Sequence, residues 1–229
     1  MRYKSALIVG AGSGLSASIA RIFAKAGLQI ALAARSSAKL SDLAAETGAR
    51  TFACDATSKD DVDRLFSALD AQPAPDVVVY NASYRARGPL AELDPVEVEK
   101  SIRVSAFGGF LVAQAAVLRM LPKGAGAIFF TGASASVKGY AQSAPFAMGK
   151  FALRGLAQSL AREMSPRGIH VAHFVIDGGI RSARRPEPPD NPDSLLDPDA
   201  IAETYLNILR QPRSAWTWEV ELRPWVEKF

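Results

Sequence analysis

Three glycines within five residues are the first group in the sequence that could do chemistry. They follow the apolar run Ala6–Val9 and stand directly before an amphipathic segment. Small residues let the backbone approach a pyrophosphate, and a helix N-terminus supplies free N–H groups and a positive dipole. A plain tight turn is the alternative, but the position between a first strand and a first helix favours a dinucleotide phosphate site. The residues expected to contact it are Gly10, Gly12, Ser13, Gly14 and Leu15.

The end of the second apolar run, Ile30–Ala33, bears on which dinucleotide binds. An acid there would hold the adenosine ribose hydroxyls of NAD. The sequence instead has Ala34, Arg35 and Ser36. No carboxylate repels a 2′-phosphate, Arg35 can pair with it, and Ser36 can donate a hydrogen bond. The sequence therefore predicts NADP(H) in preference to NAD(H), unless Arg35 only packs over the adenine, which would serve either cofactor.

With these features and two later motifs, the chain resembles the short-chain dehydrogenase/reductase family over nearly its whole length. Asp55 matches the family's adenine-binding acid, and Asn81-Ala82 match its Asn-Ala-Gly motif, with Ser83 in place of the glycine. Ser16 stands where a third glycine is usual. The further cofactor contacts implied by the resemblance are Asp55, Ala56, Asn81, Ala82, Ser83, Lys150, Gly178 and Ile180.

The resemblance also implies a catalytic set, from which this chain departs. Members move a proton with a tyrosine four residues before a lysine, helped by a serine on the fifth strand and an asparagine on the preceding helix. A nearby ammonium makes the phenol a usable acid by lowering its pKa. Here Lys150 is kept, but Phe146 occupies the tyrosine position. Ser105 stands at the asparagine position, and Ser134 matches the serine only if the loop is one residue shorter, since the usual interval leads to Ala133.

Three functions are compatible with this departure. One is an NADP(H)-dependent oxidoreductase acting on a carbonyl or alcohol, with a proton from Ser134, Ser136, Tyr140 or an ordered water. Another is hydride transfer to an activated double bond, which needs no such acid. The alternative to both is a catalytically impaired NADP(H)-binding protein that acts as a sensor or interaction partner. Because losing a general acid costs about 10²–10⁴-fold in rate, activity can survive, and we favour the oxidoreductase.

A polar, proline-rich stretch at residues 181–197 is expected to be a loop. The resemblance places the substrate-covering lid here, and such lids exclude water when they close. Its arginines, Arg181, Arg184 and Arg185, are candidates for an anionic substrate group, although a solvated run of charges is the more ordinary interpretation.

The elements that must position these residues alternate along the chain. Predicted strands are Ala6–Val9, Ile30–Ala33, Thr51–Ala53, Val77–Tyr80, Ala127–Thr131, Val171–Ile176 and Trp216–Leu222, with helices between them, including one from Pro95 to about Leu121 and one from Phe146 to Met164. Strands that are apolar throughout, separated by helices, imply a parallel sheet covered on both faces. The predicted fold is a Rossmann-type doubly wound α/β domain over residues 1–229, with about seven strands and ligands at their carboxyl ends.

Composition sets the remaining expectations. The 27 basic and 23 acidic residues give a net charge of +4 without a basic tail or face, so we expect no nucleic-acid partner. One cysteine, no metal-ligand cluster, and no stretch of about 18 uncharged apolar residues lead us to expect a cytoplasmic protein without a metal or membrane partner. We expect a small-molecule substrate, and the resemblance implies a homodimer or homotetramer.

Overall fold

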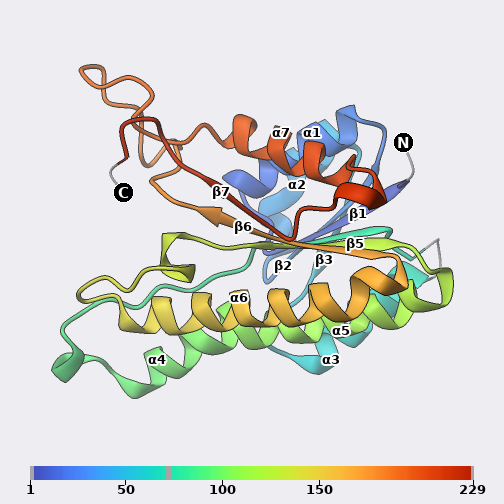
Figure 1. Cartoon of the computed structure of the whole chain (residues 1–229), viewed down its shortest axis with the longest axis horizontal. Coiled ribbons are helices and arrows are strands. Elements are labelled where there is room, and N and C mark those ends of the chain that lie inside the picture. Colours follow the sequence, from blue (N-terminus) through green and yellow to red (C-terminus); the bar gives the residue numbers. More distant parts are fainter. Residues whose placement is uncertain (1–2, 71–73, 228–229) are drawn as a thin grey trace.

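The computed structural model describes residues 3–70 and 74–227, and a seven-stranded sheet runs through the middle of them (Figure 1). The strands are β1 (Ser5–Val9), β2 (Gln29–Ala34), β3 (Arg50–Ala53), β4 (Val77–Tyr80), β5 (Gly126–Thr131), β6 (Ile169–Ile176) and β7 (Glu219–Leu222). Their order is β3-β2-β1-β4-β5-β6-β7, and all neighbours are parallel. This confirms the predicted doubly wound fold.

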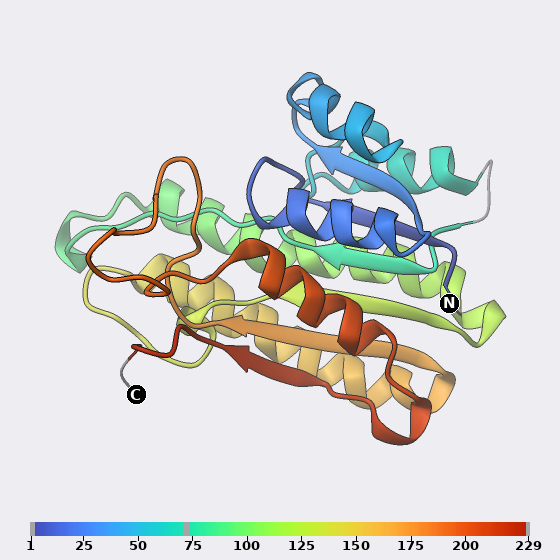
Figure 2. The same ribbon diagram turned by 90° about the horizontal axis from the view of Figure 1, so that it is seen from above.

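Helices cover both faces of the sheet, as predicted. They are α1 (Leu15–Lys25), α2 (Ser41–Thr47), α3 (Lys59–Asp70), α4 (Pro95–Ile102), α5 (Gly108–Met120), α6 (Ala144–Met164) and α7 (Pro198–Leu209). Figure 1 shows α1, α2 and α7 on one face and α3, α4, α5 and α6 on the other. Figure 2 shows that β6 and β7 point toward the end of the molecule where residues 181–197 lie.

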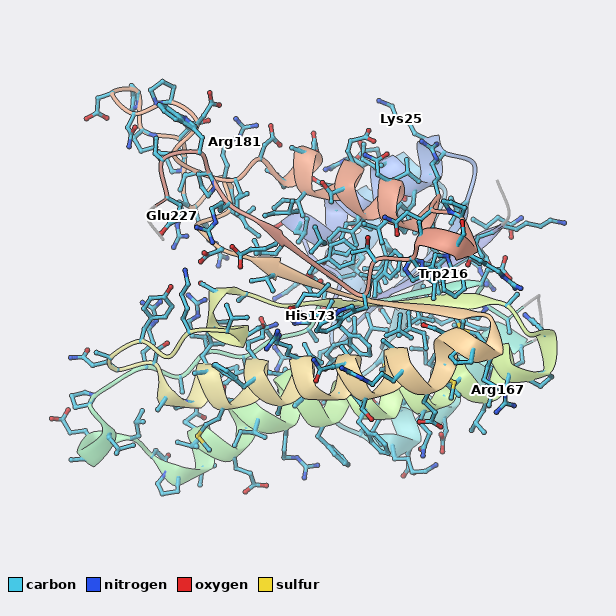
Figure 3. The ribbon with its side chains drawn as sticks, viewed as in Figure 1. Lys25, Arg167, His173, Arg181, Trp216 and Glu227 are labelled. Carbon is cyan, nitrogen blue, oxygen red and sulfur yellow. The ribbon has the colours of Figure 1, made fainter. Side chains whose placement is uncertain are left out.

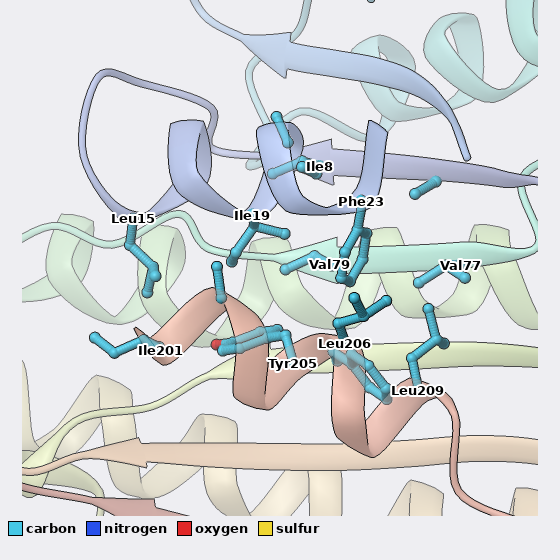
Figure 4. Packing of buried hydrophobic residues seen from close by; sticks show 14 of the residues in the cluster. Ile8, Leu15, Ile19, Phe23, Val77, Val79, Ile201, Tyr205, Leu206 and Leu209 are labelled. Carbon is cyan, nitrogen blue, oxygen red and sulfur yellow. The ribbon is translucent and has the colours of Figure 1, made fainter. Parts of the chain in front are cut away.

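The two helical layers explain why the strands are apolar throughout. Side chains alternate between the faces of a strand, so each face needs its own apolar set. In β1, Ile8 belongs to the core beneath α1 and α7, whereas Leu7 and Val9 belong to the core beneath α3, α5 and α6. Figure 4 shows the first core, where Phe23 and Tyr205 approach the sheet from two neighbouring helices.

The last strand is shorter than the predicted Trp216–Leu222, because only Glu219–Leu222 pairs with β6. The alternating pattern before it has another cause. The Trp216 ring stacks on His170 with 4.6 Å between ring centroids, and the Arg154 guanidinium lies 5.8 Å from the centre of the Trp218 ring. The Trp218 carbonyl still accepts the His173 backbone N–H at 2.8 Å, and before it the aromatic rings pack on neighbouring side chains at the sheet edge.

The helix predicted from Pro95 to Leu121 contains a π-helical turn at Arg103–Phe107, between α4 and α5. The backbone N–H of Gly108 bonds to the Arg103 carbonyl and passes over Val104. The Val104 carbonyl instead accepts the hydroxyl of Tyr80, at the end of β4. The local sequence does not reveal this turn, and its contact with Tyr80 comes from a strand 24 residues earlier in the chain. Such turns are frequent at functional sites.

The stretch Pro95–Lys123 is apolar as well as helical, although charged residues interrupt it. Within the described residues it forms one 29-residue helical stretch with a mean hydropathy of 1.6 in its best window, so by length and composition it could cross a membrane. Half of that window is buried inside the fold, and α5 packs on β4 and β5. A buried core helix has the same composition, so the pattern is weak evidence for a span.

Candidate active site and cofactor cleft

A cleft of about 920 Å³ runs along the carboxyl ends of β1 to β4. The predicted cofactor residues that line it are Gly10, Gly12, Ser13, Arg35, Ser36, Asp55, Ala56, Asn81, Ala82 and Ser83. The other predicted cofactor residues are not among the described residues that line this cleft, namely Gly14, Leu15, Lys150, Gly178 and Ile180. Four separate loops thus meet where a doubly wound sheet places its ligands.

The glycine loop packs tightly against the end of β4. Gly10 has a φ of +81°, and a Cβ there would lie 2.4 Å from the Ala82 nitrogen. A side chain at position 10 is therefore excluded both by conformation and by space. Nothing described lies within 4 Å of a Cβ placed at Gly12. The backbone at Gly12 is thus open to a ligand, whereas Gly10 is required by the fold itself.

Ser16 ties this loop to β4, a role that was not predicted. Its Oγ donates to the Gly10 carbonyl at 3.0 Å and accepts from Nδ2 of Asn81 at 2.6 Å. Ser16 occupies the position of the family's third glycine, and a small polar residue there was the available signal. The hydrogen bonds connect two predicted cofactor residues, Gly10 and Asn81, through one buried hydroxyl.

Asp55 is held in place at the end of β3. Its Oδ1 accepts from the Thr57 backbone N–H at 2.9 Å and from the Thr57 hydroxyl at 2.8 Å. Its own backbone N–H donates to Asp61 at 2.9 Å. Its other carboxylate oxygen accepts no hydrogen bond from the described residues, so an acceptor remains for a ligand in the cleft.

Two cations stand at the β2 end of the cleft. Arg35 is exposed there beside Ser36, and the neighbouring 3₁₀ turn Ser37–Leu40 adds the exposed Lys39. Neither cation forms an ion pair within the part of the chain that the structure describes. Lys39 was missed from the sequence, because its position relative to Arg35 depends on a short irregular turn. The two residues give this end of the cleft a positive charge that no described acid neutralises.

Lys150 lies in α6, one turn after Phe146, and is buried. Its Nζ donates to the Thr131 carbonyl at the end of β5 at 2.7 Å. Burial, assisted by the positive charge of Arg85, lowers the pKa of Lys150 to about 7. The one predicted catalytic residue kept from the family thus changes protonation near neutral pH.

Phe146 is buried and lies under a second cation. The Arg85 guanidinium carbon is 4.1 Å from the centre of the Phe146 ring, and the Lys150 Nζ is 5.8 Å from it. Cations favour the electron-rich face of an aromatic ring. Arg85 belongs to the loop after β4 and was not among the predicted site residues. Its position in the site depends on contact with Phe146, which lies 61 positions further along the chain.

The predicted hydroxyl residues belong to turns that α6 contacts. Ser105 lies in the π-helical turn, where its buried Oγ makes no hydrogen bond with any described residue. A Cβ on Gly149 would lie 2.8 Å from the Ser105 Cβ, so α6 approaches this turn closely. Ser134 begins the half-buried 3₁₀ turn Ser134–Ser136, and Ser136 accepts the Ala133 backbone N–H at 3.1 Å. The structure thus brings Lys150 to the end of β5 and the neighbouring Gly149 against Ser105, and it places Ser134 in the turn that follows β5.

Residues 181–197 form the predicted loop beyond β6 (Figure 3). Arg181 is held within it by ion pairs to Glu187 and Asp197. At the base of the loop, the buried Asp177 pairs with Lys138 at 2.9 Å and with Arg223 at 3.1 Å. Of the arginines considered for an anionic group, Arg181 is thus already neutralised by acids of its own loop.

The two histidines are structural. His170 bonds to the Thr217 carbonyl at 2.9 Å, and His173 bonds to Glu219 at 3.0 Å. Burial lowers the pKa of His173 to about 4, against the opposing charge of Glu219. Among the described residues, no group of three or more His, Cys, Asp or Glu side chains could hold a metal ion.

Residues 4–187 match the family model for short chain dehydrogenases. The chain belongs to this family. It is similar to a short-chain dehydrogenase from Rhodopseudomonas palustris, with 35% identity, a TM-score of 0.85, and coverage of 98% of this chain and 100% of that one. It is also similar to an alcohol dehydrogenase from Thermococcus sibiricus complexed with 5-hydroxy-NADP, with 26% identity, a TM-score of 0.87 and 98% of each chain covered.

A relative from Staphylococcus aureus (strain N315), an uncharacterized oxidoreductase, is 28% identical over 228 residues, which cover 96% of this chain and 97% of the relative. The family model and these relatives confirm the predicted membership. They support an NAD(P)-dependent oxidoreductase on a Rossmann-type fold.

Proposed function

We propose that this chain is an NADP(H)-dependent oxidoreductase that transfers a hydride between the nicotinamide and a small carbonyl, alcohol or activated double bond, without a tyrosine acid. The observation that carries the proposal is the cleft, with free cations at one end of it and the glycine loop at its centre. The catalytic region around Lys150 lies at the end of the next strand, β5.

The residues at the cleft fit this dinucleotide. The closely packed Gly10 and the open backbone at Gly12 form a cradle for the pyrophosphate. The free oxygen of Asp55 would accept from the adenine, while Arg35 and Lys39 would hold the 2′-phosphate. The NADP complexes among the similar solved structures, from Thermococcus sibiricus and from a metagenome, add support for this choice.

The dinucleotide, when bound and reduced, supplies the hydride, and this chain must supply the proton. Phe146 has none to give. Lys150 carries a proton that it can lose near neutral pH, and we assign it the exchange, relayed by the Ser134 hydroxyl or an ordered water. Ser136 is fully buried, with its Oγ accepting the Ala133 backbone N–H, and Tyr140 is half exposed, so both are weaker candidates for the donor.

The Arg85–Phe146 contact also favours a second candidate function, a catalytically impaired NADP(H)-binding protein that acts as a sensor or interaction partner. The guanidinium of Arg85 covers the face of a ring that has no proton to give, so a cation–π contact stands where the family has its acid. Both functions share the same cofactor cleft and differ only in whether the bound cofactor is turned over.

Calorimetry with NADPH and NADH, followed by a panel of aldehydes, ketones and enones, tests these proposals. We expect NADPH to bind at least about tenfold more tightly, because two charge-assisted contacts are lost with NADH. Equal affinities, or tighter NADH binding, would contradict the cofactor choice. Tight NADPH binding with no turnover on the whole panel would establish the binding function in place of the oxidoreductase.

We also propose a homodimer or homotetramer in the cytoplasm. Large apolar side chains on α5, α6 and the turn before α5 are exposed, namely Phe107, Phe110, Leu118 and Phe151. Such a patch marks an interaction surface more often than a free one. Light scattering coupled to size-exclusion chromatography should give a mass of two or four chains. A monomer at micromolar concentration would contradict the proposal.

A further inference from the structure

The loop backbone that carries Arg85 is fixed by contacts on both sides of this residue. The Tyr84 carbonyl accepts the hydroxyl of the buried Ser101 at 2.9 Å. Three residues after Arg85, the Gly88 backbone N–H donates to the Gln142 carbonyl at 3.1 Å. The loop is thus attached to α4 and to the segment before α6. The backbone on either side of Arg85 is therefore fixed, and its exposed side chain lies against the Phe146 ring.

A second guanidinium, that of Arg185, belongs to the loop of residues 181–197. Arg185 exchanges two backbone hydrogen bonds with Ser182, and these turn the loop back toward β6. A Cβ added at Gly179 would lie 2.6 Å from Nη1 of Arg185, so this guanidinium lies against the backbone just after β6. Figures 1 and 2 show the loop after β4 and residues 181–197 at the same end of the molecule.

The positive charges of Arg87 and Arg185 act on Arg85. Desolvation lowers the pKa of Arg85, and the positive charges of Arg87 and Arg185 lower it further. Within the described residues, no acid forms an ion pair with any of the three, whereas Arg181 and Lys138 nearby are both neutralised. Like charges gathered without a counterion are costly, and a bound anion would offset that cost.

We propose that Arg85 and Arg185 bind the carboxylate of the substrate, and that the protein acts on small oxo acids or the corresponding hydroxy acids. This rests on the proposed oxidoreductase function. A guanidinium presents a planar pair of donors that matches the two oxygens of a carboxylate. With Arg85 above Phe146, the carboxylate lies beside the ring, and a carbonyl one or two carbons away lies near Lys150.

Matched pairs of probes test this inference separately from turnover. The protein with NADPH bound is titrated in a calorimeter with pyruvate and methyl pyruvate, then with levulinate and methyl levulinate. At least one acid should bind about 10–100-fold more tightly than its uncharged ester, the value of one charge-assisted contact. NADPH oxidation is recorded with the same four compounds. Acid-selective binding without oxidation would support the anion site while contradicting the oxidoreductase.

Single substitutions then locate the contact. Arg85→Gln and Arg185→Gln should each weaken the preferred acid about tenfold or more and leave its ester within about twofold. Arg184→Gln is the control for position in the loop, because Arg184, unlike Arg185, is not among the charges that lower the pKa of Arg85. Equal affinities for acid and ester in the unaltered protein would overturn the proposal. So would an Arg185→Gln variant that weakens NADPH itself, because that arginine would then serve the cofactor phosphates.

Discussion

The Cα of Gly10 lies against the backbone of Ala82, so that a methyl group on Gly10 would come within 2.4 Å of the Ala82 nitrogen. This contact joins the loop after β1 to the loop after β4 and sets the floor of the cofactor cleft. Ser16 secures the same junction, since its Oγ bonds both to Gly10 and to Asn81. The shape of the cleft therefore depends on Gly10, whose close packing against Ala82 leaves no room for a side chain.

Gly10→Ala should destabilise the protein by about 2–4 kcal/mol, because it adds strain at a positive φ to overpacking against backbone. The measurement is urea unfolding of the protein without cofactor. Gly12→Ala is the matched control, since a methyl group there meets nothing within 4 Å. That variant should unfold like the unaltered protein yet bind NADPH more weakly. Equal stability of the two variants would contradict the structural role of Gly10.

Arg35→Ala should raise the Kd for NADPH about 10–100-fold and leave NADH within about twofold, because only NADPH carries the 2′-phosphate. Lys39→Ala should act in the same direction with a smaller effect, since a flexible ammonium lacks the paired donors of a guanidinium. Calorimetry with both cofactors is the measurement. Lys25→Ala, a change of the same charge at the far end of α1, should alter neither affinity. Parallel losses for both cofactors would instead place Arg35 over the adenine.

Motifs that are local in sequence were predictable. Gly10, Asp55 and Asn81 each follow an apolar strand, and parallel strands bring their carboxyl ends to one edge. The core on both faces of the sheet was also predictable, because strands such as Val77–Tyr80 contain only apolar and aromatic residues. A strand can be predicted from its own apolar pattern, without knowing which other elements pack against it.

Features that depend on a distant partner were not predictable. At the π-helical turn the Val104 carbonyl accepts the Tyr80 hydroxyl, and neither residue signals this contact alone. The position of Arg85 depends on its contact with Phe146, and the position of Lys39 depends on an irregular turn. The predicted start of the last strand at Trp216 was wrong for the same reason. The alternating pattern resembles a strand, but Trp216 packs on a distant residue, His170.

Lys150 should make stability depend on pH. Its pKa is about 7 in the folded protein, against an ordinary value of 10.5, so between these values the unfolded chain binds more protons. Stability therefore rises with pH through this window, by at most about 1.4 kcal/mol per pH unit from this group. Lys150→Met should remove that rise, as measured by urea unfolding from about pH 6 to pH 10.

The lost hydrogen bond to Thr131 lowers the stability of Lys150→Met by a constant amount, so the slope and not the absolute value is the readout. Lys123→Met, which removes an exposed lysine, should keep the slope of the unaltered protein. If Lys150→Met keeps it too, the buried amine does not titrate near neutrality, and the proton role proposed for it is wrong.

Phe146→Tyr should increase the rate of carbonyl reduction by about 10²-fold or more, the usual contribution of a general acid. The new hydroxyl would extend from a ring that lies 4.1 Å from one cation and 5.8 Å from another, and both charges favour its ionised form. Single-turnover oxidation of bound NADPH by one reducible ketone or oxo acid is the measurement. Phe146→Leu separates the hydroxyl from mere repacking, because it removes the ring and adds no acid. Equal rates for the unaltered protein and Phe146→Tyr would contradict the prediction that the missing phenol limits carbonyl reduction.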